Sequence, residues 1–189
     1  MIVGGALFLD RVDNSQRNTI RGNVEGMEPA PIQILSRAAF DLMVLSASRN
    51  WVVSIQEEEA NPIPRPEFSG NRINLAFYDL IDGPNIATAS HIEEVYRFSE
   101  RWAKAARSDP ATANLVVHCF AGISRSSAIA MIPLLLYYRS EKAAAKRLYE
   151  INRWAEPNTH VLYLTEEKFH LRGSLYCTIK AAEQGLVWQ

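Results

Sequence analysis

The chain has 189 residues, of which 48% are hydrophobic and 22% charged, and its formal net charge is −1. We expect a single domain over residues 1–189, with an irregular segment over 1–31 and a packed core over 32–189. The nearly neutral charge, with no long basic stripe, gives no reason to expect a nucleic-acid partner.

Cysteine content and apolar runs restrict the class of protein further. Cys119 and Cys177 are too few for a disulfide framework, and no Cys-x-x-Cys or His-x-x-x-His cluster suggests a metal site. The longest apolar run, 128–138, is about half of the roughly 20 residues that span a bilayer, and the N-terminus lacks the basic region of a signal peptide. We therefore expect a cytoplasmic protein with no membrane association, no cofactor and a free thiol. Composition makes no prediction of oligomeric state.

Runs of β-branched residues alternate with apolar residues at helical spacing. This alternation predicts an α/β fold in which a central, mostly parallel sheet of about four to five strands is flanked by helices. Ser36 fits a helix N-cap, and Ser90 with Glu93 fits a capping box. The expected order is a possible strand before residue 10, a strand at 32–35, a helix to 45, a strand at 51–55, a loop over 57–70, a strand at 73–78, a helix from 90 to about 109, a strand at 115–117, an apolar helix over 128–138, a helix over 141–153, and helical structure from 160 onward with a break at Gly173.

The stretch VVHCFAGISRSSA, residues 116–128, joins a predicted strand to a predicted helix. If the loop wraps into an arc, its backbone N–H groups converge and the helix adds its positive end, which suits an oxyanion. Gly122 permits the turn, and Arg125 supplies a planar fork that matches two phosphoryl oxygens. The expected phosphate-binding residues are Phe120, Ala121, Gly122, Ile123, Ser124 and Arg125.

The same surroundings act on Cys119, because a helix N-terminus and a nearby cation favour the thiolate form. Cys119 would then attack phosphorus, and Ser126 would donate a hydrogen bond to the sulfur and help it to leave. His118 is expected to orient the loop through backbone contacts. Taken singly, Cys119 also fits a small core residue and Arg125 a surface residue. The ordered string of residues at a strand–helix junction favours catalysis.

The string His118-Cys119-x-x-Gly-x-Ser-Arg-Ser126 resembles the Cys-x5-Arg signature of protein tyrosine phosphatases. Its Gly-x-Ser-Arg-Ser ending is closer to the dual-specificity branch, and Tyr78-Asp79-Leu80 resembles bacterial members. The resemblance covers residues 32–164 and includes Pro157-Asn158. It implies the phosphatase fold and a metal-free, two-step hydrolysis of phosphotyrosine, and also of phosphoserine or phosphothreonine, through a phosphocysteine at Cys119.

The leaving group of such a reaction needs a proton, and the family takes it from an aspartate upstream of the cysteine. Asp79 is expected to end the strand 73–78 and so to lie at the same sheet edge as Cys119, which favours it as the acid. Asp82 precedes Gly-Pro, where a turn explains it, but its distance along the chain from Cys119 is closer to the separation common in the family. Both assignments stay open at this point.

Two other functions fit the same residues. One is a pseudophosphatase that binds phosphorylated ligands without turnover, and the other is a phosphatase of a small-molecule or RNA phosphate. The expected partner is therefore a phosphorylated protein or a small phosphoester. Cys177 is a candidate to resolve an oxidised Cys119 by forming a disulfide, although a plain helix-face thiol explains it as well. The weaker polar candidates are Arg65, Arg72, His160, Glu166 and His170.

Overall fold

The computed structural model describes residues 26–57, 65, 67–171 and 173–186. These residues form a four-stranded sheet in the order β1-β4-β2-β3, and all neighbouring strands are parallel. The predicted α/β architecture is therefore confirmed. The possible strand before residue 10 and most of the loop over 57–70 lie outside the described residues. The strands are β1 (Ile32–Ser36), β2 (Asn50–Gln56), β3 (Asn71–Ala76) and β4 (Asn114–Cys119).

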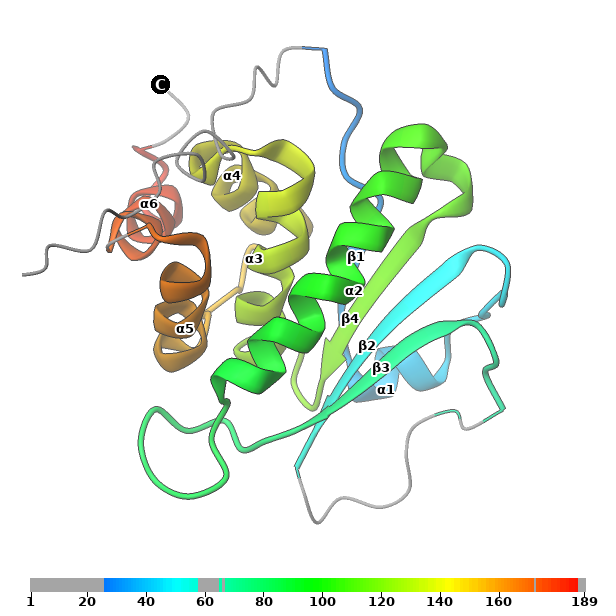
Figure 1. The fold of residues 1–189 in the computed structure, drawn as a ribbon, viewed down its shortest axis with the longest axis horizontal. Coiled ribbons are helices and arrows are strands. Elements are labelled where there is room, and N and C mark those ends of the chain that lie inside the picture. The colour runs from blue at the N-terminus through cyan, green and yellow to red at the C-terminus, as the bar shows by residue number, and fades with distance from the viewer. Residues whose placement is uncertain (1–25, 58–64, 66, 172, 187–189) are drawn as a thin grey trace, which may run out of the picture.

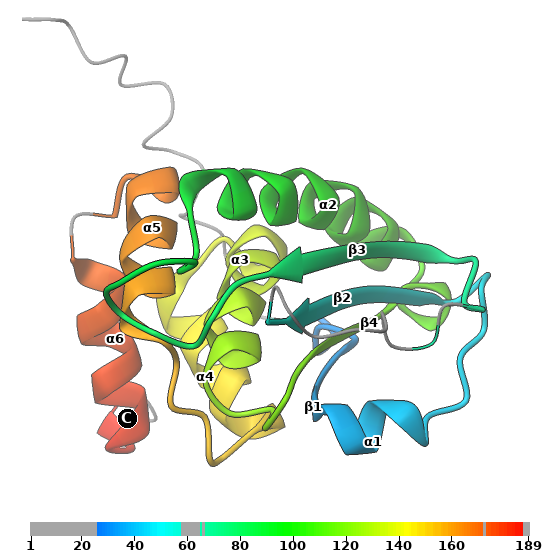
Figure 2. The same ribbon diagram turned by 90° about the horizontal axis from the view of Figure 1, so that it is seen from below.

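Helices cover the two faces of the sheet unequally (Figures 1 and 2). On one face α2 and α3 pack against the strands, with α4, α5 and α6 beyond them. On the opposite face lies the short helix α1. No helix among the described residues is long and apolar enough to cross a membrane. The helices are α1 (Arg37–Asp41), α2 (Ala89–Ser108), the 3-10 turn η2 (Pro110–Thr112), α3 (Arg125–Tyr138), α4 (Glu141–Ile151), α5 (Thr159–Phe169) and α6 (Ser174–Glu183).

Strand β4 lies between β1 and β2 and sends alternate side chains to opposite faces of the sheet. Val117 and Cys119 join the large core beneath the helices, whereas Val116 packs with Phe40 of α1 in a small second core. His118 stacks on the same Phe40 ring. The nucleophile candidate and the histidine before it therefore point to opposite sides of the sheet.

The helix that Ser36 caps is shorter than predicted, since it ends at Asp41 instead of residue 45. Phe40 is the only buried side chain in this helix, and Leu42 and Val44 beyond it are exposed. Met43 and Leu45 still pack against the Phe40 core, but from the turn and extended chain that follow the helix. Helix α4 likewise ends at Ile151 and not at residue 153, because the backbone of Asn152 is extended.

Two further predicted boundaries near the site are wrong. Strand β3 ends at Ala76, and the Tyr78 N–H donates to Asn85 O at 2.8 Å, which folds the following residues into a loop. Helix α2 begins at Ala89 with Thr88 as its N-cap, and the Thr88 N–H donates to His91 Nδ1 at 3.0 Å. Ser90 and Glu93 therefore do not form the predicted capping box. We call residues 77–88, between β3 and α2, the acid loop.

Candidate active site

The segment between β4 and α3, which we call the phosphate loop (residues 119–125), curls around the sulfur of Cys119. The Gly122 N–H donates to Sγ at 3.3 Å, and Ser126 Oγ lies 3.2 Å from Sγ. Cys119 is buried and is the last residue of β4, whereas the predicted strand ended at residue 117. The structure thus brings together Cys119, Gly122, Arg125 and Ser126 at the carboxyl end of a central strand, where α/β folds bind ligands.

Carbonyl groups of the phosphate loop are bonded to the surrounding elements. Phe120 O accepts from the Arg37 N–H at 3.1 Å, and Ile123 O accepts from the Glu156 N–H at 3.2 Å. Gly122 O accepts from the Asn152 side chain at 2.8 Å. The N–H and C=O of one planar peptide point in opposite directions, so these carbonyls turn the N–H groups of the same peptides away from the surrounding elements, and the Gly122 N–H points at the sulfur. This is the geometry of an anion-binding nest.

Gly122 is required at its position for two reasons. Its φ is +76°, in the left-handed region that glycine adopts without strain. A Cβ here would lie 2.6 Å from Ser36 N and 2.7 Å from Leu35 C, both backbone atoms of β1. The loop therefore packs directly against the end of the neighbouring strand.

Arg125, the first residue of α3, is buried with its guanidinium in the same cavity as Cys119. One terminal nitrogen donates to Phe77 O at 2.9 Å, and the other lies 3.7 Å from Glu57 Oε1. Nε makes no hydrogen bond to the described residues. A buried guanidinium that lines a cavity, with one terminal nitrogen that makes no hydrogen bond to the described residues, suits an oxyanion.

Asp79 is held over the phosphate loop by two side chains. Its Oδ1 accepts from Ser124 Oγ at 2.7 Å and from Asn158 Nδ2 at 2.9 Å. Its Oδ2 lies 3.9 Å from Arg125 Nε. Asp79 is thus beside the loop although it lies beyond the end of β3, in the acid loop and not at the strand end.

Asp82 lies in a different environment. Its Oδ1 accepts from the N–H of the next residue, Gly83, at 2.8 Å, as in a turn. No described hydrogen bond or ion pair joins its carboxylate to the phosphate loop. The geometry therefore favours Asp79 as the carboxyl group that faces the site.

His118 does not orient the loop through backbone contacts as predicted. Its Nε2 lies 2.8 Å from Ser54 Oγ, which also accepts from Arg72 at 2.9 Å, and its ring stacks on Phe40 with centroids 3.9 Å apart. Burial, and to a smaller extent the positive charges of Arg37 and Arg72, lower the pKa of His118 to about 3. The ring is therefore neutral and supports β4 from the face opposite the nucleophile.

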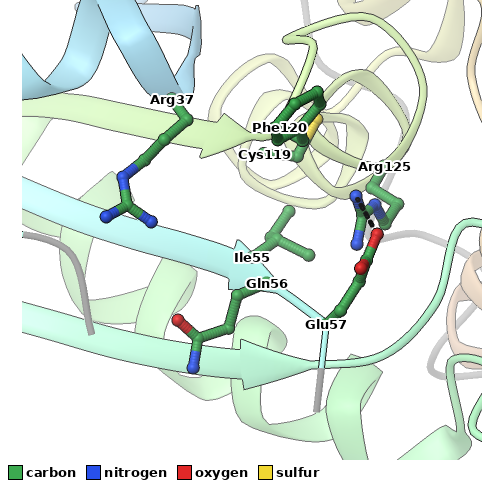
Figure 3. A pocket seen from close by; sticks show the side chains of 7 residues that line it. All are labelled: Arg37, Ile55, Gln56, Glu57, Cys119, Phe120 and Arg125. Atoms are coloured by element: carbon green, nitrogen blue, oxygen red, sulfur yellow. Dashed lines mark ion pairs between the residues drawn. The ribbon is translucent and has the colours of Figure 1, made fainter. Parts of the chain in front are cut away.

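A cavity of about 240 Å³ opens beside the sulfur (Figure 3). Phe120, the residue after the nucleophile, is 77% exposed at this cavity. Sequence reasoning missed Arg37 and Glu57, which also line it. Both directly follow strands, so they lie at the same sheet edge as Cys119. The lining residues are Arg37, Ile55, Gln56, Glu57, Cys119, Phe120 and Arg125.

The weaker candidates from the sequence have structural contacts away from Cys119. Arg65 donates to the carbonyls of Asp41 and Met43, and Arg72 to Ser54, Asn74 and Arg65. His160 Nε2 lies 2.8 Å from Ala87 O, His170 is the left-handed C-cap of α5, and Glu166 accepts from the Tyr176 N–H.

The exposed thiol of Cys177 is on α6, which packs on α4 and α5. Its proposed partnership with Cys119 stays a prediction. In the part of the chain that the structure describes, no group of three or more His, Cys, Asp or Glu residues is placed to hold a metal ion.

No protein-family model matches the sequence, and no curated protein matches it. Solved structures do match the fold. Human DUSP28 superposes with a TM-score of 0.56 at 17% identity over 75% of this chain and 90% of that one. A mouse putative dual specificity phosphatase, complexed with zinc tungstate, superposes with a TM-score of 0.50 at 18% identity over 83% and 96%.

Tk-PTP in its active form superposes with a TM-score of 0.51 at 15% identity, over 73% of this chain and 88% of that one. At these identities the similarity establishes the architecture. The chain has the fold of the dual-specificity and protein tyrosine phosphatases, as the resemblance of the phosphate loop implied.

Proposed function

We propose that this protein is a cysteine-dependent phosphatase that hydrolyses phosphate monoesters, phosphotyrosine first and phosphoserine or phosphothreonine as well, through a phosphocysteine intermediate. The observation that carries the proposal is the set of contacts at one sulfur: the Gly122 N–H at 3.3 Å and Ser126 Oγ at 3.2 Å, with Arg125 in the same cavity. These contacts hold Sγ at the centre of the phosphate loop, where it can attack a phosphorus atom whose oxygens are bound by Arg125 and the loop amides.

In the first step, Cys119 Sγ attacks phosphorus and the P–O bond to the leaving group breaks. Arg125 and the loop amides bind the non-bridging oxygens, where charge is concentrated in the transition state. Asp79, through the Oδ2 that Ser124 and Asn158 leave free, gives its proton to the leaving oxygen.

In the second step, the ionised Asp79 takes a proton from a water molecule that attacks the phosphocysteine. The S–P bond breaks and inorganic phosphate leaves. Ser126 Oγ donates to the departing sulfur, as its 3.2 Å contact with Sγ permits, and stabilises the thiolate.

The test compares wild type with Cys119→Ser on p-nitrophenyl phosphate and on phosphotyrosine, phosphoserine and phosphothreonine peptides. We expect wild type to turn over the aryl substrates fastest and Cys119→Ser to be inactive while it still binds phosphopeptide. Turnover that survives Cys119→Ser would contradict the mechanism. Binding without turnover by wild type would favour a phosphopeptide-binding module, and turnover of small phosphoesters alone would place the substrate outside proteins.

A further inference from the structure

The cavity beside Cys119 is longer than a phosphoryl group requires. Cys119 and Arg125 lie at one end of it, and the side chains of Arg37 and Gln56 lie at the other (Figure 3). Ile55 lies between the two ends. A phosphoryl group bound by the phosphate loop leaves the second end to another part of the substrate.

The sheet fixes Arg37 beside the nucleophile. Ser36 is the register partner of Cys119 in the β1–β4 pair. The residues that directly follow the two strands continue the contact, because the Arg37 N–H donates to Phe120 O at 3.1 Å. The Arg37 backbone is therefore fixed against the phosphate loop. Its side chain extends from this fixed position along the cavity.

The Arg37 side chain retains donors for a ligand. Its Nε bonds both carboxylate oxygens of Asp41, at 3.1 and 3.0 Å. Among the described residues this is the only partner of the guanidinium, so its two terminal nitrogens are left for the cavity.

A guanidinium whose terminal nitrogens have no partner among the described residues complements a carboxylate carried on a peptide. The two terminal nitrogens of the planar fork match the two carboxylate oxygens. Ile55 between the ends, and the exposed ring of Phe120 beside Cys119, offer apolar surface to an aromatic ring (Figure 3). The cavity therefore fits a phosphorylated aromatic residue followed or preceded by an acidic one.

We infer that Arg37 determines specificity by binding an acidic residue next to phosphotyrosine in a peptide substrate. This inference rests on the proposed function and adds to it the class of peptide that the enzyme prefers. Asp41 competes with the substrate carboxylate for the same guanidinium, so it limits the preference that Arg37 confers.

The test measures kcat/KM at low salt for pairs of phosphotyrosine peptides that differ only by Glu or Gln beside the phosphotyrosine. A solvated ion pair predicts that wild type favours the Glu peptide about threefold to tenfold, with the preference falling at high salt. We expect Arg37→Gln to bring the ratio to about one and Asp41→Asn to raise it above that of wild type. Arg97→Gln, which removes an exposed arginine paired with Glu93 on α2, is the matched control and keeps the wild-type ratio.

The ratio is taken within each enzyme, so a loss of folded protein in one variant cancels. A wild-type ratio near one, or an equal ratio in wild type, Arg37→Gln and Asp41→Asn, would overturn the inference. If wild type turns over p-nitrophenyl phosphate in those cases, the proposed function stands without it. If wild type turns over no phosphoester, the proposed function is wrong, and the inference about Arg37 is wrong as well.

Discussion

The two loops that meet at the candidate site are built differently. The phosphate loop is held by its backbone, since its carbonyls accept from Arg37, Asn152 and Glu156 on the elements around it, and Cys119 is buried. The acid loop presents an exposed Asp79, which is held by the side chains of Ser124 and Asn158.

This difference separates two requirements of the proposed chemistry. Binding an oxyanion needs several amides in fixed directions, which only a rigid backbone can provide. Giving a proton to one leaving group and taking one from water needs a single carboxyl group that contacts substrate and solvent in turn. Substitutions in the two loops should therefore have different effects: those in the acid loop should lower kcat, and those in the phosphate loop should lower both kcat/KM and stability.

The largest effect on the acid loop is expected from Asp79→Asn. Removing the proton donor should lower kcat on phenyl phosphate about 10²–10⁴-fold. Because Asp82 serves a turn, Asp82→Asn is the matched control and should keep kcat within about twofold of wild type. Steady-state kinetics on phenyl phosphate check both, and a larger loss from Asp82→Asn would reverse the assignment of the acid.

Gly122→Ala should disrupt the conformation of the phosphate loop most directly. The added Cβ would meet Ser36 N at 2.6 Å, so the loop must move, and we expect kcat/KM to fall about 10²-fold or more. Stability should fall by about 2–4 kcal/mol, measured by urea unfolding.

Gly173→Ala distinguishes the backbone strain of a positive φ from the steric clash expected at Gly122. Gly173 also has a positive φ, +87°, but nothing lies within 4 Å of a Cβ there. It should cost about 1–2 kcal/mol of stability and leave activity unchanged. Equal losses from Gly122→Ala and Gly173→Ala would show that contact with β1 is not what shapes the loop.

The link between the loops is tested by Ser124→Ala. Loss of its 2.7 Å bond to Asp79 Oδ1 should lower kcat on phenyl phosphate about tenfold, with a smaller effect on p-nitrophenyl phosphate, whose leaving group needs less protonation. Combined with Asp79→Asn, it should cause no further loss. A full additional loss in the double variant would mean that Ser124 acts on the phosphate loop itself.

His118→Gln is expected to leave activity nearly unchanged and to alter how stability depends on pH. The buried ring has a pKa of about 3 against 6.5 when unfolded, so the unfolded chain binds more protons between these values and stability rises with pH. The contribution is full above the unfolded pKa and is lost as pH falls toward 3. Relative to His118→Gln, wild type should lose about 2–3 kcal/mol of unfolding free energy from about pH 7 to about pH 4. Parallel urea-unfolding curves for the two proteins would contradict this.

The phosphate loop was largely predictable from the sequence, because its requirements are local. Few local structures are compatible with a strand that is followed, at fixed spacing, by a cysteine, a glycine and an arginine and then by an apolar helix. The parallel sheet followed in the same way from alternating patterns.

The contacts that hold the Asp79 side chain were not predictable from the sequence, because they join residues far apart in the chain. Ser124 and Asn158 reach Asp79 from the phosphate loop and from the start of α5. The sequence points to Pro157-Asn158 only through the family resemblance and predicts no partner for the Asn158 side chain. The direction of His118 followed from strand alternation once β4 was known to extend through Cys119, but the strand predicted from the sequence stopped at residue 117.

The central claim is that Cys119 carries the phosphoryl group, and the most direct measurement is to trap it. Ser126→Ala should slow departure of the sulfur more than its attack. Rapid acid quenching during turnover of p-nitrophenyl phosphate, followed by mass spectrometry of peptides, should then find the mass of one phosphoryl group on the peptide that contains Cys119, together with a stoichiometric burst of p-nitrophenol. A phosphoryl group on any other residue, or turnover with none bound to the protein, would contradict the account.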